Sequence, residues 1–257
     1  MASKVPQITA LFWVIKVLTT GMGEATSDYL GGIDLVLAGG VGVVGFAVAL
    51  WLQFRTDRYR PVVYWFAVMM VAVFGTMVAD VVHVVGVPYA VTTPFYGLAL
   101  AVVLALWWRA EGTLSIHSIT TRRREVWYWL TVLVTFALGT AAGDLTATSL
   151  HLGFFRSGVL FAVAILVPLA GFRLGANEVV TFWTAYVITR PLGASFADWF
   201  GKEHSVGGGL GYGDGPVAGV MLAAIVVLVA YVAVQGRQMP VATGDDQPSS
   251  SRQKQNG

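Results

Sequence analysis

Long apolar runs recur along the whole of this chain, and they limit its fold more than any other feature. Two examples are "VLAGGVGVVGFAVALWLQF" at 36–54 and "VAGVMLAAIVVLVAYVAV" at 217–234. A transmembrane helix needs about 20 mostly apolar residues to cross the hydrocarbon core of a bilayer. The composition agrees, since 56% of the residues are hydrophobic and 12% are charged. We therefore predict an all-α integral membrane protein.

A motif made of an aromatic–Trp pair, a glycine and an aspartate occurs four times along the chain. In each copy nine residues separate the Trp from the Gly, and four residues separate the Gly from the Asp. The pairs are Phe12-Trp13, Tyr64-Trp65, Tyr128-Trp129 and Phe182-Trp183; the glycines are Gly23, Gly75, Gly139 and Gly193; the aspartates are Asp28, Asp80, Asp144 and Asp198. Such recurrence indicates internal duplication.

Each repeat contains two apolar stretches, so the sequence predicts eight transmembrane helices. They lie near 9-30, 34-54, 62-85, 90-108, 126-148, 154-173, 178-200 and 215-235. Because two spans return the chain to its starting side, we expect four parallel two-helix repeats with both termini on one side. The predicted domains are an eight-helix membrane domain, 1-236, with repeats at roughly 9-60, 61-125, 126-177 and 178-236, and a disordered tail, 237-257.

The arginines and lysines predict which side of the membrane holds the termini. Twelve of them lie in the N-terminal segment, in the connections after the second, fourth and sixth spans, and in the tail. The opposite side carries only Arg156 and Lys202. The positive-inside rule therefore places both termini, and the tail, in the cytoplasm. Most tryptophans fall on the same side, and we interpret the Trp of each repeat as an interfacial anchor.

Two segments carry a resemblance to a known family: "KVPQITALFWVIKVLTTGMGEATSDYL" at the start, and "YVITRPLGASFADWFGK" with "GGGLGYGDGPVAG" near the end. Over roughly residues 4–236 the chain resembles bacterial uncharacterised membrane-anchored proteins built from four copies of a two-helix repeat of unknown function with a characteristic Trp. The resemblance implies the eight-helix architecture and a multi-pass protein of the bacterial inner (cytoplasmic) membrane. It implies no particular activity.

Charged residues inside the predicted spans are the main functional signal. The four repeat aspartates are expected to lie at similar depth, and a small residue four positions after each repeat glycine completes a seam along which helices approach closely. In the first span Lys16, Thr20, Glu24 and Asp28 follow one another at intervals of four and must share one helical face. A face of this kind is expected to point into the bundle.

The seventh predicted span contains Arg190 next to Pro191. Arg190 precedes Asp198 by about two helical turns, so we expect it to pair with an acid of another repeat, such as Glu24. Pro191 removes one backbone hydrogen bond and is expected to kink the helix. In the third span Asp80 and His83 share a face, at a spacing compatible with one metal ion or a proton relay.

Ionisable groups inside a membrane indicate an ion or proton path. The resulting hypothesis is a transporter or channel for a small cation, either a proton or a divalent metal ion. The expected ion-binding or proton-path residues are Asp28, Asp80, Asp144, Asp198, Glu24 and His83; the expected charge-balancing or gating residues are Lys16 and Arg190; and the candidate metal ligands are Asp80 and His83. The expected partners are the lipid bilayer and the cation.

No enzymatic activity, catalytic residue or cofactor is expected, and the small net charge of +2 argues against nucleic acid as a partner. The sequence does not determine the oligomeric state, and a homo-oligomer is one of the states that it allows. Two alternatives are also left open. In the first, the chain is a non-transporting membrane scaffold or assembly protein whose charges hold helices together. In the second, the Gly-x-Gly-Asp sequence at 211–214 belongs to an intramembrane aspartyl protease.

Overall fold

The computed structural model describes residues 3–238, and every regular element within this range is helical. Residues 239–257, which make up most of the predicted disordered tail, lie outside the described residues. The α-helices are α1 (Ala10–Ile33), α2 (Leu35–Phe54), α3 (Pro61–Val84), α4 (Tyr89–Glu111), α5 (Arg122–Asp144), α6 (Gly153–Ala164), α7 (Leu166–Arg173), α8 (Glu178–Gly201) and α9 (Asp214–Gln238). A 3-10 turn, η1 (Ile116–Ser118), and a π-helical turn, η2 (Leu145–Ser149), complete the list.

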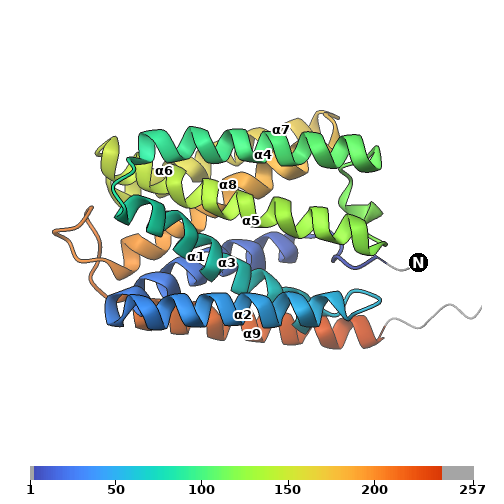
Figure 1. Ribbon diagram of the computed structural model, residues 1–257, viewed down its shortest axis with the longest axis horizontal. Helices are drawn as coiled ribbons and strands as arrows, with labels where there is room; N and C mark the ends of the chain where they lie inside the picture. Colours follow the sequence, from blue (N-terminus) through green and yellow to red (C-terminus); the bar gives the residue numbers. More distant parts are fainter. Residues whose placement is uncertain (1–2, 239–257) are drawn as a thin grey trace, which may run out of the picture.

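Four helices form the interior, and the other helices surround them. α1 packs against α3 and α8, and α5 packs against the same two helices, so the four close into a ring. Figure 1 shows α1 and α3 in the middle of the molecule, with α4 along one long edge and α2 along the other. The outer helices expose large apolar side chains, for example Val36, which is 84% exposed. An apolar surface of this extent is expected of helices that face lipid.

Six helical segments in the described part of the chain are long and apolar enough to cross a bilayer. They are Leu35–Phe54, Pro61–Val84, Tyr89–Glu111, Arg122–Ser149, Gly153–Arg173 and Asp214–Gln235. These segments identify a multi-pass membrane protein. The predicted first and seventh spans, which are now α1 and α8, are not among the six; both are inner helices and carry most of the buried charged residues.

The ends of the inner helices follow local sequence signals. The side chain of Thr9 accepts a hydrogen bond from the backbone N–H of Phe12 at the start of α1, and Thr121 and Asn177 cap α5 and α8 in the same way. α3 begins at Pro61, where the missing N–H of proline costs no helical hydrogen bond. Each inner helix is therefore given a defined starting point.

The repeat glycines allow the inner helices to approach one another. A side chain added at any of them would collide with the next inner helix. The residue that it would meet lies seven positions after the repeat Trp of that next helix. The contacts are Gly23 with Ala72, Gly75 with Phe136, Gly139 with Arg190, and Gly193 with Thr20. The last contact returns from the fourth repeat to the first. The small-residue seam predicted from the sequence thus closes the ring of four inner helices.

The predicted sixth span, 154-173, is divided into α6 and α7. Pro168 lies in the first turn of α7 and has no backbone N–H to donate to the carbonyl of Ala164, where α6 ends. The predicted fifth span, 126-148, is α-helical only as far as Asp144 and ends in η2, a π-helical turn. The sequence identified both spans but neither irregularity.

Three of the four repeat tryptophans lie inside the bundle, so their interpretation as interfacial anchors is wrong. Trp65, Trp129 and Trp183 are between 1% and 5% exposed. Each ring packs on the aromatic residue that begins the preceding repeat, with ring centroids 5.6 to 6.2 Å apart. An inner helix has neighbours where an outer helix has lipid, and its Trp fills the space between repeats.

Candidate functional site

The four repeat aspartates line a single cavity of about 360 Å³. Glu24, His83 and Lys202 also line it. Each inner helix contacts the repeat glycine of the preceding inner helix at one position, and its repeat aspartate lies eight residues after that position. The ring of four helices therefore brings the four aspartates together. The convergence of the acids predicted from the sequence is therefore present in the structure, and it includes Glu24.

Three of the five acids form a tighter group. Glu24, Asp28 and Asp198 each offer one carboxylate oxygen, and these oxygens lie within 4.8 Å of one another. Glu24 is 3% exposed and Asp198 is 4% exposed. The Oδ1 atom of Asp198 is buried and has no hydrogen-bond partner within residues 3–238. Carboxylate oxygens at this separation are ligands suited to a hard cation.

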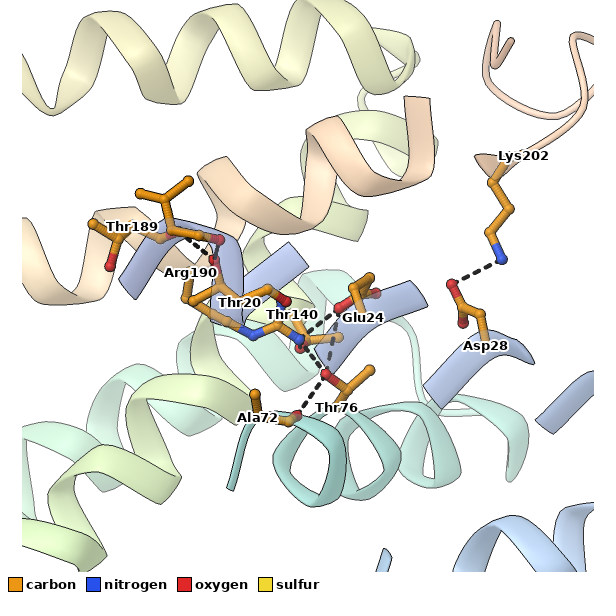
Figure 2. A network of polar contacts seen from close by, with 10 residues as sticks. Thr20, Glu24, Asp28, Ala72, Thr76, Thr140, Thr189, Arg190 and Lys202 are labelled. Carbon is orange, nitrogen blue, oxygen red and sulfur yellow. Dashed lines mark hydrogen bonds and ion pairs between the residues drawn. The ribbon is translucent and has the colours of Figure 1, made fainter. Parts of the chain in front are cut away.

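Arg190 contacts Glu24 of this group and is fully buried. Its Nη2 atom is 2.5 Å from Oε2 of Glu24 and donates to the hydroxyls of Thr140, at 2.7 Å, and Thr76. Its Nη1 atom donates to the carbonyl oxygen of Thr20 at 3.3 Å. Figure 2 shows these partners converging on the guanidinium from three other inner helices. The predicted pairing of Arg190 with Glu24 is confirmed.

The Arg190 network occupies two layers of the repeat. Glu24, Thr76 and Thr140 each lie eleven residues after a repeat Trp, and Arg190 lies seven residues after one. One repeat therefore supplies the acid, another supplies the arginine, and the remaining two supply hydroxyls that accept hydrogen bonds from the guanidinium. Thr76 and Thr140 were not predicted as site residues, although their register with Glu24 in the repeat would have identified them.

Lys16 contacts no acid within residues 3–238. Its Nζ atom lies 4.3 Å from the ring centroids of both Phe136 and Tyr186, and it has no hydrogen-bond partner in the part of the chain that is described. Lys16 and Glu24 are two turns apart on α1, about 12 Å along the axis. The cation therefore rests on aromatic faces and does not balance the acids by direct contact.

His83 and Asp80 line the cavity but are not part of the tight group of carboxylates. The ring of His83 stacks on Tyr89 with centroids 3.9 Å apart, and its Nδ1 atom is 3.2 Å from the carbonyl oxygen of Val87. These contacts hold the imidazole at the edge of the cavity. The carboxylate group around Asp198 is consequently a better cation site than the Asp80/His83 pair.

Lys202 bridges Asp28, which belongs to this group, and Asp214, which does not. Its Nζ atom lies 2.8 Å from Asp28 Oδ2 and 3.1 Å from Asp214 Oδ2. Asp214 is the aspartate of the Gly-x-Gly-Asp sequence, and its carboxylate meets this ammonium. An aspartyl protease instead needs two carboxylates that share a proton. The bridging role of Lys202 was not predicted, because the sequence places it only in an external connection.

A second buried ion pair lies at the other end of the inner helices. Lys4 Nζ is 2.7 Å from Glu125 Oε2, and Gln53 Nε2 donates to Glu125 Oε1 at 3.0 Å. Glu125 is fully buried. The N-terminal segment therefore crosses this end of the ring and is fixed there by a charged contact.

Four stretches of the chain match the family described as Repeat of Unknown Function (DUF347). The matched residues are 11–59, 63–113, 127–173 and 181–238. Each match begins near a repeat Trp and covers one inner helix with the outer helix or helices that follow it. No curated protein and no solved structure shows detectable similarity to the chain.

Proposed function

We propose, for a chain that belongs to the DUF347 repeat family, that this protein is a membrane transporter or channel for a small cation, a proton or a divalent metal ion. The observation that carries the proposal is the convergence of five carboxylates on one cavity inside an apolar bundle. A charged side chain inside a membrane costs roughly 3 kcal/mol or more unless it has an ion-pair or hydrogen-bond partner. Several acids gathered around a cavity at this cost indicate an ion path.

The balance of charge at the cavity favours a cation. Among the cations in the described range, Arg190 and Lys202 contact the acids of the cavity by ion pairs. Two positive charges facing five carboxylates leave an excess of negative charge when the acids are ionised. A cavity with walls of low dielectric concentrates this field and attracts positive ions. The acids are the binding groups in this proposal, and no enzyme activity or cofactor is part of it.

Access to the cavity is unequal from the two ends of the bundle. The side chains of Asp28 and Lys202 are 22% and 25% exposed, so water reaches the cavity at their end. On the other side of Arg190, the aromatic layer around Trp65 fills the space between the four inner helices, and the Lys4–Glu125 pair closes the far end of the bundle. A transporter that exposes its site to one side at a time needs such an asymmetry. In this mechanism Arg190 separates the hydrated half from the closed half.

The proposed topology has eight membrane-spanning helices in four parallel repeats, with both termini in the cytoplasm of a bacterial cell and the protein in its inner membrane. The bias of arginine and lysine supports this orientation. α1 and α8 cross the membrane as inner helices, where their charges contact protein and the cavity. The acidic cavity then opens to the outside, on the side of the loop between α8 and α9.

Reporter fusions are expected to confirm this topology. A reporter fused after Gly236 or inserted beside Arg123 should give a cytoplasmic signal, and one inserted beside Gly208 should give an external signal. The reason is that the first two positions lie on the arginine-rich side and the third on the other. Paired phosphatase and fluorescent reporters would measure this. A cytoplasmic signal at Gly208 would contradict the parallel-repeat model.

A membrane scaffold is the second candidate, and one observation favours it. Arg190 is held by side chains or backbone atoms of the other three inner helices, which is how a charge that only joins helices would be arranged. The two candidates differ over the acids that Arg190 does not touch. A scaffold gives no reason for Asp198 to leave a buried oxygen unpartnered, whereas a cation site does.

Proteoliposomes test the proposal directly. Purified protein should carry protons, Mn²⁺ or Mg²⁺ across the bilayer down an imposed gradient, detected with a pH-sensitive or metal-sensitive dye inside the vesicles. Vesicles without protein are the control for leakage. Failure to move any of these ions, by a protein that is folded and monodisperse, would sink the transport proposal and favour the scaffold.

A further inference from the structure

Lys202 places a positive charge against the tight group of carboxylates. It follows the last residue of α8, and its ammonium reaches Asp28, one of the three acids in that group. The same nitrogen also contacts Asp214, which lies outside the group at the start of α9. The side chain therefore has two partners, one inside the candidate cation site and one beside it.

The backbone of Lys202 is fixed, although its side chain is long. Its N–H donates to the carbonyl oxygen of Asp198 at 2.8 Å, and its own carbonyl oxygen accepts from Gly211 at 2.8 Å. Gly209 packs so closely on the Lys202 carbonyl that it has no space for a side chain. The four-carbon stem is consequently the part that can move, and a rotation can withdraw the ammonium from Asp28 while it stays near Asp214.

The ammonium is charged under ordinary conditions. The ammonium lies 2.8 Å from Asp28 Oδ2 and 3.1 Å from Asp214 Oδ2, and two carboxylates at these distances favour its charged form. Lys202 therefore acts as a permanent cation at neutral pH, and any ion that enters the group competes with it.

The charges around the group match a divalent ion once Lys202 has left. Glu24, Asp28 and Asp198 contribute three negative charges when ionised, and Arg190 contributes one positive charge through Glu24. With Lys202 bound to Asp28 the sum is one negative charge, and with Lys202 withdrawn to Asp214 it is two. No group in the described part of the chain bonds to Oδ1 of Asp198, so this atom is a buried oxygen available as a ligand.

We propose that Glu24, Asp28 and Asp198 bind a hard divalent cation such as Mn²⁺, and that Lys202 is the built-in competitor that this ion must displace from Asp28. The inference rests on the proposed function and names its substrate class. An ion of single charge offsets less of the negative charge at the group than the divalent ion does. Lys202 is thus a specificity-determining residue, and its withdrawal sets the threshold for occupancy.

Equilibrium binding of Mn²⁺ to purified protein, followed by the paramagnetic resonance signal of free Mn²⁺, tests this assignment. Lys202→Gln should bind Mn²⁺ at least about tenfold more tightly than the wild type, because no ammonium competes for Asp28. Arg156→Gln removes an exposed cation of the same predicted side and should leave the affinity unchanged within about twofold.

A second variant should shift the affinity in the opposite direction. Asp214→Asn keeps Lys202 but removes its other charged partner, so the ammonium should hold Asp28 more firmly and Mn²⁺ should bind more weakly. This variant also tests the assignment if Lys202→Gln does not fold.

The outcomes separate the two proposals. Unchanged or weaker binding by folded Lys202→Gln, or unchanged or tighter binding by Asp214→Asn, overturns the competitor role even where the wild type transports ions. A wild type that binds Mn²⁺ with these shifts but carries no flux overturns transport and leaves the site standing. Absence of Mn²⁺ binding from both the wild type and Lys202→Gln overturns the site.

Discussion

Arg190→Ala is expected to remove most of the folded protein. The substitution leaves the Glu24 carboxylate buried without its partner, and it leaves the hydroxyls of Thr76 and Thr140 without the guanidinium to which they are bonded. Breaking a buried ion pair by removing one member costs about 3 to 5 kcal/mol, a large part of the stability of a typical domain. Size-exclusion chromatography of a fluorescent fusion would measure the yield of monodisperse protein.

The matched control is Arg173→Ala, which removes an exposed arginine at the end of α7 and should have little effect on yield. Adding Glu24→Gln to Arg190→Ala should restore part of the lost stability, because the stranded charge is then absent. A double-mutant cycle on unfolding in detergent should give a coupling energy of about 1 to 3 kcal/mol. Strictly additive losses would contradict the pairing as an energetic unit.

Asp198→Asn is expected to reduce ion flux in proteoliposomes at least about tenfold while the protein stays folded. The amide has nearly the shape of the carboxylate but no charge. Because Oδ1 of Asp198 has no hydrogen-bond partner among the residues described, the substitution breaks no recorded contact at that atom. The loss should therefore appear in transport and leave the yield unchanged.

Asp57→Asn provides the control for this variant, since Asp57 is an exposed aspartate in the connection between α2 and α3. Its flux should equal that of the wild type. Wild-type flux through Asp198→Asn would remove Asp198 from the ion path. A variant that is unfolded would instead show that the carboxylate stabilises the bundle.

The sequence predicted those parts of the fold that depend on the repeat. Placing Gly193 and Asp198 in register with the other copies was enough to predict a close-packed seam with acids gathered at one depth. It also predicted that Arg190 needs an acid from another helix, because Asp198 lies too far along its own helix. Regular positions in a duplicated unit translate into regular positions in space, and these predictions used no other information.

The remaining features depended on contacts that the repeat does not encode. Lys202 reaches Asp28 because the loop after α8 folds back beside the end of that helix, and a glycine-rich sequence does not specify such a path. The tryptophans were interpreted as anchors because they lie on the arginine-rich side of the predicted spans, and this position does not show whether a ring faces lipid or a neighbouring helix. The sequence predicted that Lys16 balances an acid, but its ammonium lies against the aromatic rings of Phe136 and Tyr186.

Locating a bound ion tests the central claim most directly. Crystals grown with Mn²⁺ and measured at its absorption edge should give an anomalous difference peak inside the cavity, within ligand distance of Asp28 and Asp198, with the Lys202 ammonium withdrawn toward Asp214. A hard divalent cation bound by oxygen ligands lies about 2.0 to 2.6 Å from each donor atom, and the peak should lie at such distances. An empty cavity at a Mn²⁺ concentration that supports flux, or a peak only at a site remote from these aspartates, would contradict the account.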